Sequence, residues 1–378
     1  GERSRFGAAR AGTTAMDSKR QIRYAVVGAG NIAQVAVLPA FEHTHNSKLV
    51  AVISGDAEKR NALRDTYDLE FAADYAELES ILERAHIDAV YVATPNALHH
   101  QFVLRAAERG VHVLCEKPLA LSAAECRELA DTCNEHDVKL MVAYRLHFEA
   151  ATLQAIEVAR SGQLGALRLF SSFVSQVVRP DDVRRDARLG GGATYDLGVY
   201  CVNAARNLFG AEPTRVVAAS VARLGTDDST MAILEFPQEC MAMLCVGNST
   251  SNVSSYRIAG TEGDLRVEPA YDYAAERIHH LTVGGRTRRT VFRKSDQFAP
   301  ELTYFSDCIL NDREPEPSAE EAWCDARVLD AILEAAESHR AVELAPYERA
   351  RRPSVSQLDE VSPIKRPRTV NAPGPSAR

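Results

Sequence analysis

Short apolar runs alternate with stretches of helical periodicity through the first third of the chain. Uninterrupted apolar runs of this length are typical of strands buried on both faces of a parallel sheet, and the stretches between them suit crossover helices. The alternation predicts an α/β domain over residues 21–145, with a doubly wound parallel sheet of six strands. The runs that carry this prediction lie at residues 23–27, 48–53, 87–93, 111–115 and 139–143, the last being the expected sixth strand.

The pattern changes near residue 148, where extended segments follow one another with few helices between them. Runs of strands after a βα domain indicate an α+β domain with a mostly antiparallel, open sheet, which we place at residues 146–345. Ser318 and Glu321 are expected to form a capping box at the start of the last predicted helix. The predicted strands are 167–174, 214–223, 229–236, 240–246, 254–259 and 264–268, and the predicted late helices are 299–311 and 318–338.

Both ends of the chain are basic. Residues 1–20 are expected to be a flexible N-terminal extension, and residues 346–378, rich in Pro, Ser and Arg, a disordered basic tail. The basic run at 365–368 also fits a nuclear-targeting or polyanion-binding segment, which stays open as an alternative. Because the whole chain carries a net charge of -8, the body between the basic ends is acidic, which argues against nucleic-acid binding.

The composition, 46% hydrophobic and 25% charged, is ordinary for a soluble globular protein. No apolar run approaches the roughly 18 residues of a membrane span, and the N-terminus lacks the apolar stretch of a secretory signal. The eight cysteines show no metal-site spacing. These features predict no membrane association, no metal site and a reducing, cytoplasmic setting.

The first predicted strand runs directly into Gly-Ala-Gly-Asn-Ile-Ala at residues 28–33, and a helical stretch follows. This is the dinucleotide pattern G-x-G-x-x-A in its required context between strand and helix. Its first glycine allows the tight turn, its second lets the backbone approach a pyrophosphate, and the helix N-terminus favours the phosphate charge. The residues expected at the phosphates are Gly28, Gly30, Asn31 and Ile32.

The second strand ends in Ser54 and Gly55, where an NAD-selective protein places a carboxylate for the ribose 2′-hydroxyl. Lys59 and Arg60 follow at the next helix start. A hydroxyl with two cations suits a 2′-phosphate, so the sequence favours NADP over NAD. In the alternative, Asp56 reaches the ribose and the two cations are a solvated first turn, which leaves NAD possible.

Polar residues also follow three later strands, at the sheet edge where an open α/β sheet binds its ligands. Pro118 must end the strand predicted at 111–115, because proline cannot donate to a ladder. An ordinary solvated strand end is the alternative there, and His99 serves equally well as a cap of its own helix. The expected cofactor-site residues of this group are Thr94, Asn96, His99, Glu116 and Arg145, with Lys117 aimed into the crevice.

A glycine run at 190–192 precedes an amphipathic helix, expected at 193–208. Asp196 and Tyr200 lie four residues apart in it, so both project from one face. Taken alone, a tyrosine in an apolar helix indicates a core position with a satisfied hydroxyl.

Together these landmarks resemble the glucose–fructose oxidoreductase, inositol dehydrogenase and rhizopine-catabolism (Gfo/Idh/MocA) family, whose first domain is a Rossmann fold. The resemblance covers roughly residues 21–345 and is closest to the family's NADP-using sugar branch. One departure is a missing Trp-Arg pair before the glycine run, where this chain reads Asp-Asp-Val-Arg-Arg at 181–185. The matching pieces are GAGNIA at 28–33, TPN at 94–96 with His99, EKP at 116–118, YRLHF at 144–148 and GGGATYDLGVY at 190–200.

The resemblance implies hydride transfer between a nicotinamide and a carbinol or carbonyl carbon of a sugar or polyol. Lys117 would hold the reacting oxygen, and Tyr200 would exchange its proton, with a pKa lowered by the nearby ammonium. Asp196 would orient substrate hydroxyls, and Arg145 would lie near the nicotinamide or the substrate. We expect a cytoplasmic sugar dehydrogenase or reductase with an exchangeable NADP, forming a homodimer or homotetramer through the second sheet.

Two other functions stay open. One is an NAD-dependent inositol or dihydrodiol-type dehydrogenase of the same family. The other is a non-catalytic NADP-sensing regulator, which retention of both Lys117 and Tyr200 disfavours.

Overall fold

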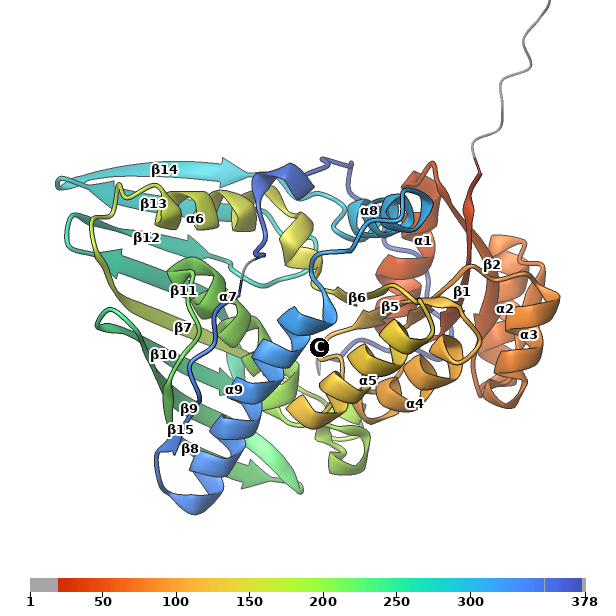
Figure 1. The fold of residues 1–378 in the computed structure, drawn as a ribbon, viewed down its shortest axis with the longest axis horizontal. Coiled ribbons are helices and arrows are strands. Elements are labelled where there is room, and N and C mark those ends of the chain that lie inside the picture. The colour runs from red at the N-terminus through yellow and green to blue at the C-terminus, as the bar shows by residue number, and fades with distance from the viewer. Residues whose placement is uncertain (1–19, 350, 376–378) are drawn as a thin grey trace, which may run out of the picture.

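Two β-sheets carry the fold, and the computed structural model describes residues 20–349 and 351–375 (Figure 1). The first sheet has six parallel strands in the order β3-β2-β1-β4-β5-β6, which is the Rossmann order and confirms the predicted doubly wound sheet. The order reverses between β1 and β4, so a ligand crevice is expected there. The strands are β1 Ile22–Val27, β2 Ser47–Ile53, β3 Phe71–Ala73, β4 Ala89–Val92, β5 His112–Glu116 and β6 Leu140–Ala143.

Helices connect these strands and cover both faces of the sheet. The helix after the glycine-rich turn opens as a π-helix, η1, and Asp56 caps α2 by accepting the Lys59 N–H at 3.0 Å. The short strand β3 is the one element of this sheet whose residues the hydrophobic pattern did not single out. The helices are η1 Ala33–Val37, α1 Leu38–Ala40, η2 Phe41–His43, α2 Ala57–Tyr67, η3 Tyr75–Glu77, α3 Leu78–Arg84, α4 Asn96–Ala107 and α5 Ala123–Glu135.

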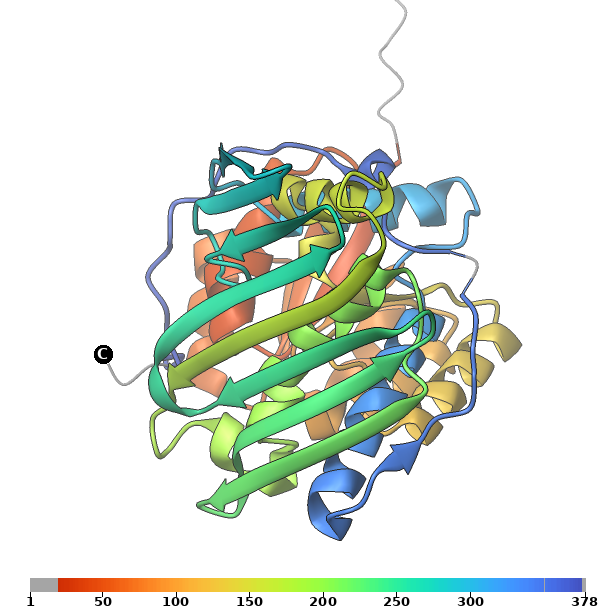
Figure 2. The same cartoon turned by 90° about the vertical axis from the view of Figure 1, so that its left-hand side faces the viewer.

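The second sheet has nine strands in the order β14-β13-β12-β11-β7-β10-β9-β8-β15. Only the β7–β10 pair is parallel, so the predicted mostly antiparallel sheet is confirmed. Figure 2 looks onto its open face. The strands are β7 Leu167–Val177, β8 Arg215–Arg223, β9 Thr226–Phe236, β10 Cys240–Gly247, β11 Ser249–Gly260, β12 Gly263–Glu268, β13 Arg277–Val283, β14 Arg286–Phe292 and β15 Val342–Glu343.

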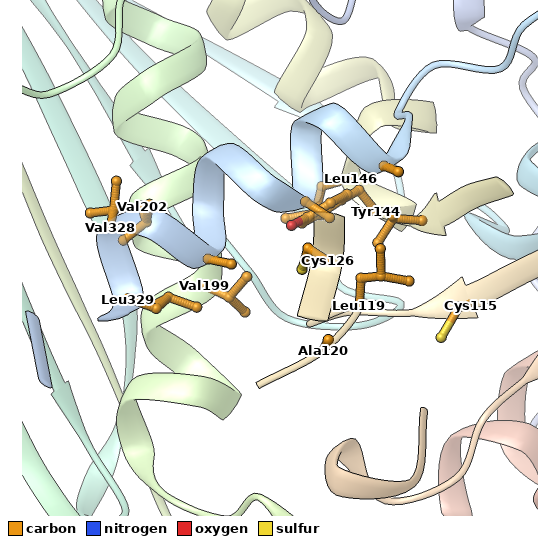
Figure 3. Packing of buried hydrophobic residues seen from close by; sticks show 14 of the residues in the cluster. Cys115, Leu119, Ala120, Cys126, Tyr144, Leu146, Val199, Val202, Val328 and Leu329 are labelled. Carbon is orange, nitrogen blue, oxygen red and sulfur yellow. The ribbon is translucent and has the colours of Figure 1, made fainter. Parts of the chain in front are cut away.

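The helices of the second half join the two sheets. α8 lies against the first sheet, with Phe298, Leu302 and Phe305 fully buried there, whereas α9 packs on α5, α7 and β8. Figure 3 shows Val328 and Leu329 of α9 beside the side chains of α7, in one core shared by both halves. These elements are η4 Arg145–Phe148, α6 Ala150–Arg160, η5 Val183–Arg185, η6 Ala187–Leu189, η7 Thr194–Gly198, α7 Val199–Phe209, α8 Phe298–Leu310, α9 Ala319–Ser338 and η8 Val355–Gln357. The expected boundary at residue 145 therefore separates the strands of the two sheets. It does not separate the helices, because α8 follows the boundary and packs on the first sheet. The domain bounds remain a prediction.

The capping box predicted at the start of α9 is wrong. The Ser318 side chain makes no cap hydrogen bond. Glu321 is fully buried and accepts instead from the guanidinium groups of Arg206 and Arg349. The local pattern fitted a cap, but a buried ion-pair cluster takes the carboxylate.

The predicted disordered tail also differs from the structure. Arg349 is 5% exposed and donates to Glu316 at 2.8 Å, and Val361 forms a bridge with Asp296. The tail then follows the surface to residue 375, as the dark blue trace in Figure 2 shows. Two of its arginines, Arg349 and Arg352, are not simply solvated, because they compensate buried carboxylates on the body. The predicted extension at residues 1–19 lies outside the described residues.

Within residues 20–349 and 351–375, no helix has the length and apolar content needed to cross a membrane. In the same part of the chain, no group of three or more His, Cys, Asp or Glu side chains is placed to hold a metal ion. The eight cysteines are free thiols, and seven of them are buried.

Candidate active site

A cleft of about 1010 Å³ lies at the carboxyl ends of the first sheet's strands and reaches across to the second sheet. Its position is the strand-order reversal where doubly wound sheets bind ligands. Four predicted site residues do not line it: Gly28, Ser54, Gly55 and Arg60. The predicted residues that do line it are Gly30, Asn31, Ile32, Lys59, Thr94, Asn96, His99, Glu116, Lys117, Arg145, Asp196 and Tyr200.

The glycine-rich turn fits a dinucleotide. Gly28 has φ +97, and a Cβ there would lie 2.6 Å from the Ala93 carbonyl oxygen, so only glycine fits the turn. At Gly30 the nearest atom to an added Cβ is 3.9 Å away, which leaves its backbone open for close approach. The buried Thr94 hydroxyl at the end of β4 has no partner among the described residues. The first amides of the helix that follows the glycine-rich turn favour an anion.

The residues after β2 divide into two roles. The Arg60 guanidinium donates to the Ser54 carbonyl oxygen at 2.9 Å and to Asp74 at 3.3 Å, so it holds the turn. Lys59 lines the cleft. The Asp56 carboxylate accepts from the helix backbone as the α2 cap, and this contact lowers its pKa. Preference for NADP through Ser54 and Lys59 therefore stays a prediction, with Lys59 as the cation that faces the ligand space.

Lys117 and Tyr200 meet across the cleft. The Lys117 ammonium lies 4.2 Å from the centroid of the Tyr200 ring and donates to the Asp196 carbonyl oxygen at 3.0 Å. It is also 4.0 Å from the Asp196 carboxylate. The lysine directly follows β5, and the η7–α7 helix supplies the other two residues. The structure thus brings together the three residues expected to be catalytic.

Arg145, directly after β6, completes this group. Its guanidinium donates to the Tyr271 carbonyl oxygen at 2.6 Å and lies 3.4 Å from the Tyr200 hydroxyl. Burial by itself raises the pKa of Tyr200, but the charges of Arg145 and then Lys117 outweigh burial and lower this pKa below 10.0. The predicted direction of the shift therefore holds, with Arg145 as the stronger of the two cations.

His99 connects the ends of two strands. The fully buried imidazole lies 2.9 Å from the Thr94 carbonyl oxygen and 2.8 Å from the Pro118 carbonyl oxygen. Both neighbours are acceptors, and a neutral imidazole donates to one of them. Burial lowers the pKa of His99. The ring fixes the segment that carries Lys117 relative to β4.

Two residues at the substrate end were missed by sequence reasoning. The Gln176 amide donates to Asp196 at 2.7 Å. The Arg184 guanidinium donates to the same Asp196 oxygen at 3.0 Å and to Asp182 at 3.0 Å, and the charge of Asp196 raises the pKa of Arg184. The charged loop before the glycine run was a usable signal for Arg184, whereas nothing in β7 marked Gln176.

Glu301, which lies next to the predicted Glu116 at the Tyr91 hydroxyl, was missed as well. The Tyr91 hydroxyl donates to Glu116 at 2.9 Å and lies 3.5 Å from Glu301. Glu301 is fully buried, and its other oxygen has no partner among the described residues. Burial raises the pKa of both carboxyl groups. The usable signal was a glutamate within the apolar stripe of α8.

Fold and cleft together define a two-domain protein whose first domain binds a dinucleotide. The model of an oxidoreductase family with an NAD-binding Rossmann fold matches residues 22–144, and the GFO/IDH/MocA C-terminal domain matches residues 152–266. The chain therefore belongs to the Gfo/Idh/MocA family of oxidoreductases.

Several relatives resemble the chain over most of its length. D-xylose 1-dehydrogenase [NADP(+)] of Haloarcula marismortui is 33% identical, over 85% of this chain and 93% of that protein. The structure of aldose-aldose oxidoreductase from Caulobacter crescentus, complexed with glycerol, has a TM-score of 0.82 at 33% identity, over 86% of this chain and 100% of the other. KijD10, a 3-ketoreductase from Actinomadura kijaniata in complex with NADP and TDP-benzene, has a TM-score of 0.78 at 26% identity, over 84% and 98%.

Proposed function

We propose that the protein is an NADP-dependent oxidoreductase that transfers hydride between the nicotinamide and a carbinol or carbonyl carbon of a sugar. The observation that carries the proposal is the Lys117 ammonium beside the Tyr200 ring in a dinucleotide-sized cleft. The similarity to a xylose dehydrogenase and an aldose oxidoreductase supports a sugar as the substrate class.

The chain's own residues supply charge and proton handling. The bound nicotinamide would supply or accept the hydride. In sugar oxidation the Tyr200 phenolate takes the hydroxyl proton, and in reduction the phenol returns it. The Lys117 ammonium donates to the reacting oxygen and stabilises the negative charge that develops there. Arg145, 3.4 Å from the phenol oxygen, stabilises the phenolate form.

Asp196 is held ready for substrate hydroxyl groups. One of its oxygens accepts from both Gln176 and Arg184, so the carboxylate is fixed in position before substrate arrives. A fixed acceptor beside a lysine and a tyrosine suits a polyhydroxylated substrate, which offers several donors in a set geometry.

A substrate screen and one variant test the proposal. Purified protein is mixed with NADP or NADPH and a panel of aldoses, ketoses and cyclitols, and absorbance at the nicotinamide band reports turnover. Lys117→Ala is expected to lower kcat by about 10²–10³-fold, because one oxyanion donor is lost. Lys48→Ala, at an exposed lysine that pairs with Glu70, is the matched control and should keep full turnover.

The outcomes separate the functions that remain. Near wild-type turnover in Lys117→Ala would remove the role given to this lysine. Tight NADPH binding without turnover on any sugar would instead support the sensor alternative. Turnover on cyclitols with NAD alone would support the inositol dehydrogenase alternative.

Cofactor preference is tested at Lys59. If the Lys59 ammonium contacts a 2′-phosphate, Lys59→Ala should weaken NADPH binding by about tenfold or more and leave NADH binding almost unchanged. An exposed charge pair contributes up to about 1 kcal/mol to binding, and a charge-assisted hydrogen bond contributes more. Calorimetric titration of both cofactors measures the difference. Equal losses for the two would contradict the NADP assignment.

We also propose that the protein self-associates through the open face of the second sheet. Large apolar side chains on this face are widely exposed, among them Met231 at 63% and Met243 at 55%. Contiguous exposed apolar patches mark interaction sites.

A further inference from the structure

The C-terminal segment 370–375 lies across the cofactor end of the cleft. The Val370 N–H donates to the Gln34 side-chain oxygen at 2.7 Å, and the Gln34 amide nitrogen donates to the Val370 carbonyl oxygen at 2.9 Å. The Asn31 amide donates to the Ala372 carbonyl oxygen at 2.9 Å. Asn31 and Gln34 belong to the glycine-rich turn and the helix that follows it, so these hydrogen bonds hold the segment beside the expected pyrophosphate position.

Further contacts extend the segment across both halves of the protein. The Asn371 amide donates to Glu58 at 3.1 Å and lies 3.4 Å from Asp56, at the start of α2. At the other end, the Arg179 N–H in the loop after β7 donates to the Pro375 carbonyl oxygen at 3.1 Å. The segment therefore connects the nucleotide-binding half to the substrate-binding half over the cleft.

The segment borders the cleft without filling it. Asn371, Ala372, Pro373 and Pro375 contribute to its wall, and Ala372 is 5% exposed. The cleft still measures about 1010 Å³ with the segment in place, which is the upper end of the usual range of small-molecule sites, about 300–1,000 Å³. Both family models end before this segment, at residues 144 and 266.

We propose that residues 370–375 form a strap that retains the bound nicotinamide dinucleotide. The inference rests on the proposed function, because it assumes that the dinucleotide occupies this cleft. Among the body side chains that bond the strap, only Asn31 lines the cleft, whereas Gln34 and Glu58 lie outside its lining, so their hydrogen bonds persist when the cleft is filled. Release of the cofactor then requires the strap to open, and the strap slows dissociation.

The test uses the full-length chain with a matched pair of substitutions at one position. Val370→Pro removes the N–H that Gln34 accepts, whereas Val370→Ala keeps both backbone groups. Adding Asn371→Ala to Val370→Pro also removes the contacts with α2. Stopped-flow fluorescence measures NADPH dissociation after mixing with excess NADP.

The double variant should release NADPH roughly tenfold faster, since each lost hydrogen bond contributes about 0.5–1.5 kcal/mol. Val370→Ala should match the wild type. Hydrogen exchange provides a readout independent of release: NADPH should slow exchange of the amides in 370–375 in the wild type and not in the double variant.

The outcomes separate this inference from the proposed function. If the wild type binds neither NADPH nor NADH, the proposed function fails together with the strap. If it binds them and the double variant releases NADPH at the wild-type rate, the strap alone is overturned. Tighter NADPH binding by the double variant would also overturn it, because the segment would then compete with the cofactor.

Discussion

Tyr200 is the residue whose chemistry is most strongly set by its neighbours. Two cations face it, the Lys117 ammonium over its ring and the Arg145 guanidinium near its hydroxyl. Burial alone favours the neutral phenol, and the two positive charges reverse that preference. A phenol that ionises more easily can serve as the base in alcohol oxidation and as the acid in carbonyl reduction.

This balance predicts a specific pH profile. In the oxidation direction the phenolate is the active form, so kcat should rise with pH through an inflection below 10.0, the ordinary pKa of tyrosine. Arg145→Met removes the stronger cation and should move the inflection to higher pH. Initial rates at saturating NADP and sugar between pH 6 and about 10.5 measure the inflection.

Tyr200→Phe provides the control for this profile. Without a phenol the inflection should disappear and kcat should fall by about 10²–10⁴-fold, the usual contribution of a positioned acid or base. An inflection that survives in Tyr200→Phe would assign the titration to another group. An Arg145→Met profile identical to that of the wild type would remove Arg145 from the ionisation of Tyr200.

Residues of the site differ in how far the sequence could predict them. The positions of Lys117 and the glycine-rich turn could be predicted from the local sequence. Each directly follows a strand that a glycine or a proline ends, and the carboxyl ends of parallel strands lie at the same edge of the sheet. Gln176 and Arg184 reach Asp196 only through the fold of a long loop and a sheet strand. The charged loop indicated that Arg184 could be functional, but no local pattern along the chain predicts that Arg184 and Gln176 contact the same carboxylate.

At the scale of elements, long apolar runs and regular alternation predicted most strands. β3 has three residues and two of them are half-buried, so it left too weak a pattern. β14 is polar and exposed along most of its length and sits at the sheet edge, where no second layer demands apolar residues. The packing of α8 on the first sheet could not be predicted either, because the apolar stripe of a helix indicates that one face is buried but not which sheet covers it.

The burial of charged residues in the C-terminal tail could not be predicted from the sequence either. Its arginines fitted a solvated segment, yet Arg349 pairs with Glu316, Glu320 and Glu321 at the start of α9. Composition gives the number of arginines in the tail, but it does not predict which of them pair with buried carboxylates.

This cluster predicts a large loss of stability in one variant. Arg349→Ala should lower the free energy of unfolding by about 3–5 kcal/mol, because it leaves the buried Glu316 carboxylate without a cation and removes one of the two cations that pair with Glu321. Burial already raises the pKa of Glu316 against the pull of Arg349. The loss should therefore shrink at low pH, where the uncompensated carboxyl can take a proton. Urea denaturation at pH 7.5 and 5.5 measures both effects.

Arg351→Ala is the matched control. Arg351 is exposed and donates to the Glu314 carbonyl oxygen at 3.1 Å, so its loss should change the free energy of unfolding by no more than about 0.5 kcal/mol. Equal effects of the two substitutions would show that the tail arginines contribute only general charge.

At the scale of the whole molecule, the second sheet has one covered and one open face. Alternate residues of its central strands are buried under α6 and α7 or exposed on the open side, and the exposed ones line up across strands. Val217 pairs with Ile233 and Ile233 with Met243 in one row, and Met231 pairs with Cys245 in the next. This apolar surface is continuous, as an interface between identical copies requires.

We therefore expect a homodimer or homotetramer in which this face is buried between copies. Ile233→Asp places a charge in each copy's half of the interface, and in a symmetric contact both charges would be desolvated. The variant should shift to monomer at micromolar concentration, as measured by sedimentation velocity.

Val355→Asp changes a β-branched side chain of similar exposure, 48% against 45%, on η8 away from this face, and should keep the wild-type assembly. A wild-type protein that sediments as a monomer would contradict the interface, and an Ile233→Asp oligomer would place the contact elsewhere. Because the cleft opens on the opposite side of the sheet from Ile233, the monomeric variant should still bind NADPH, which separates loss of assembly from loss of fold.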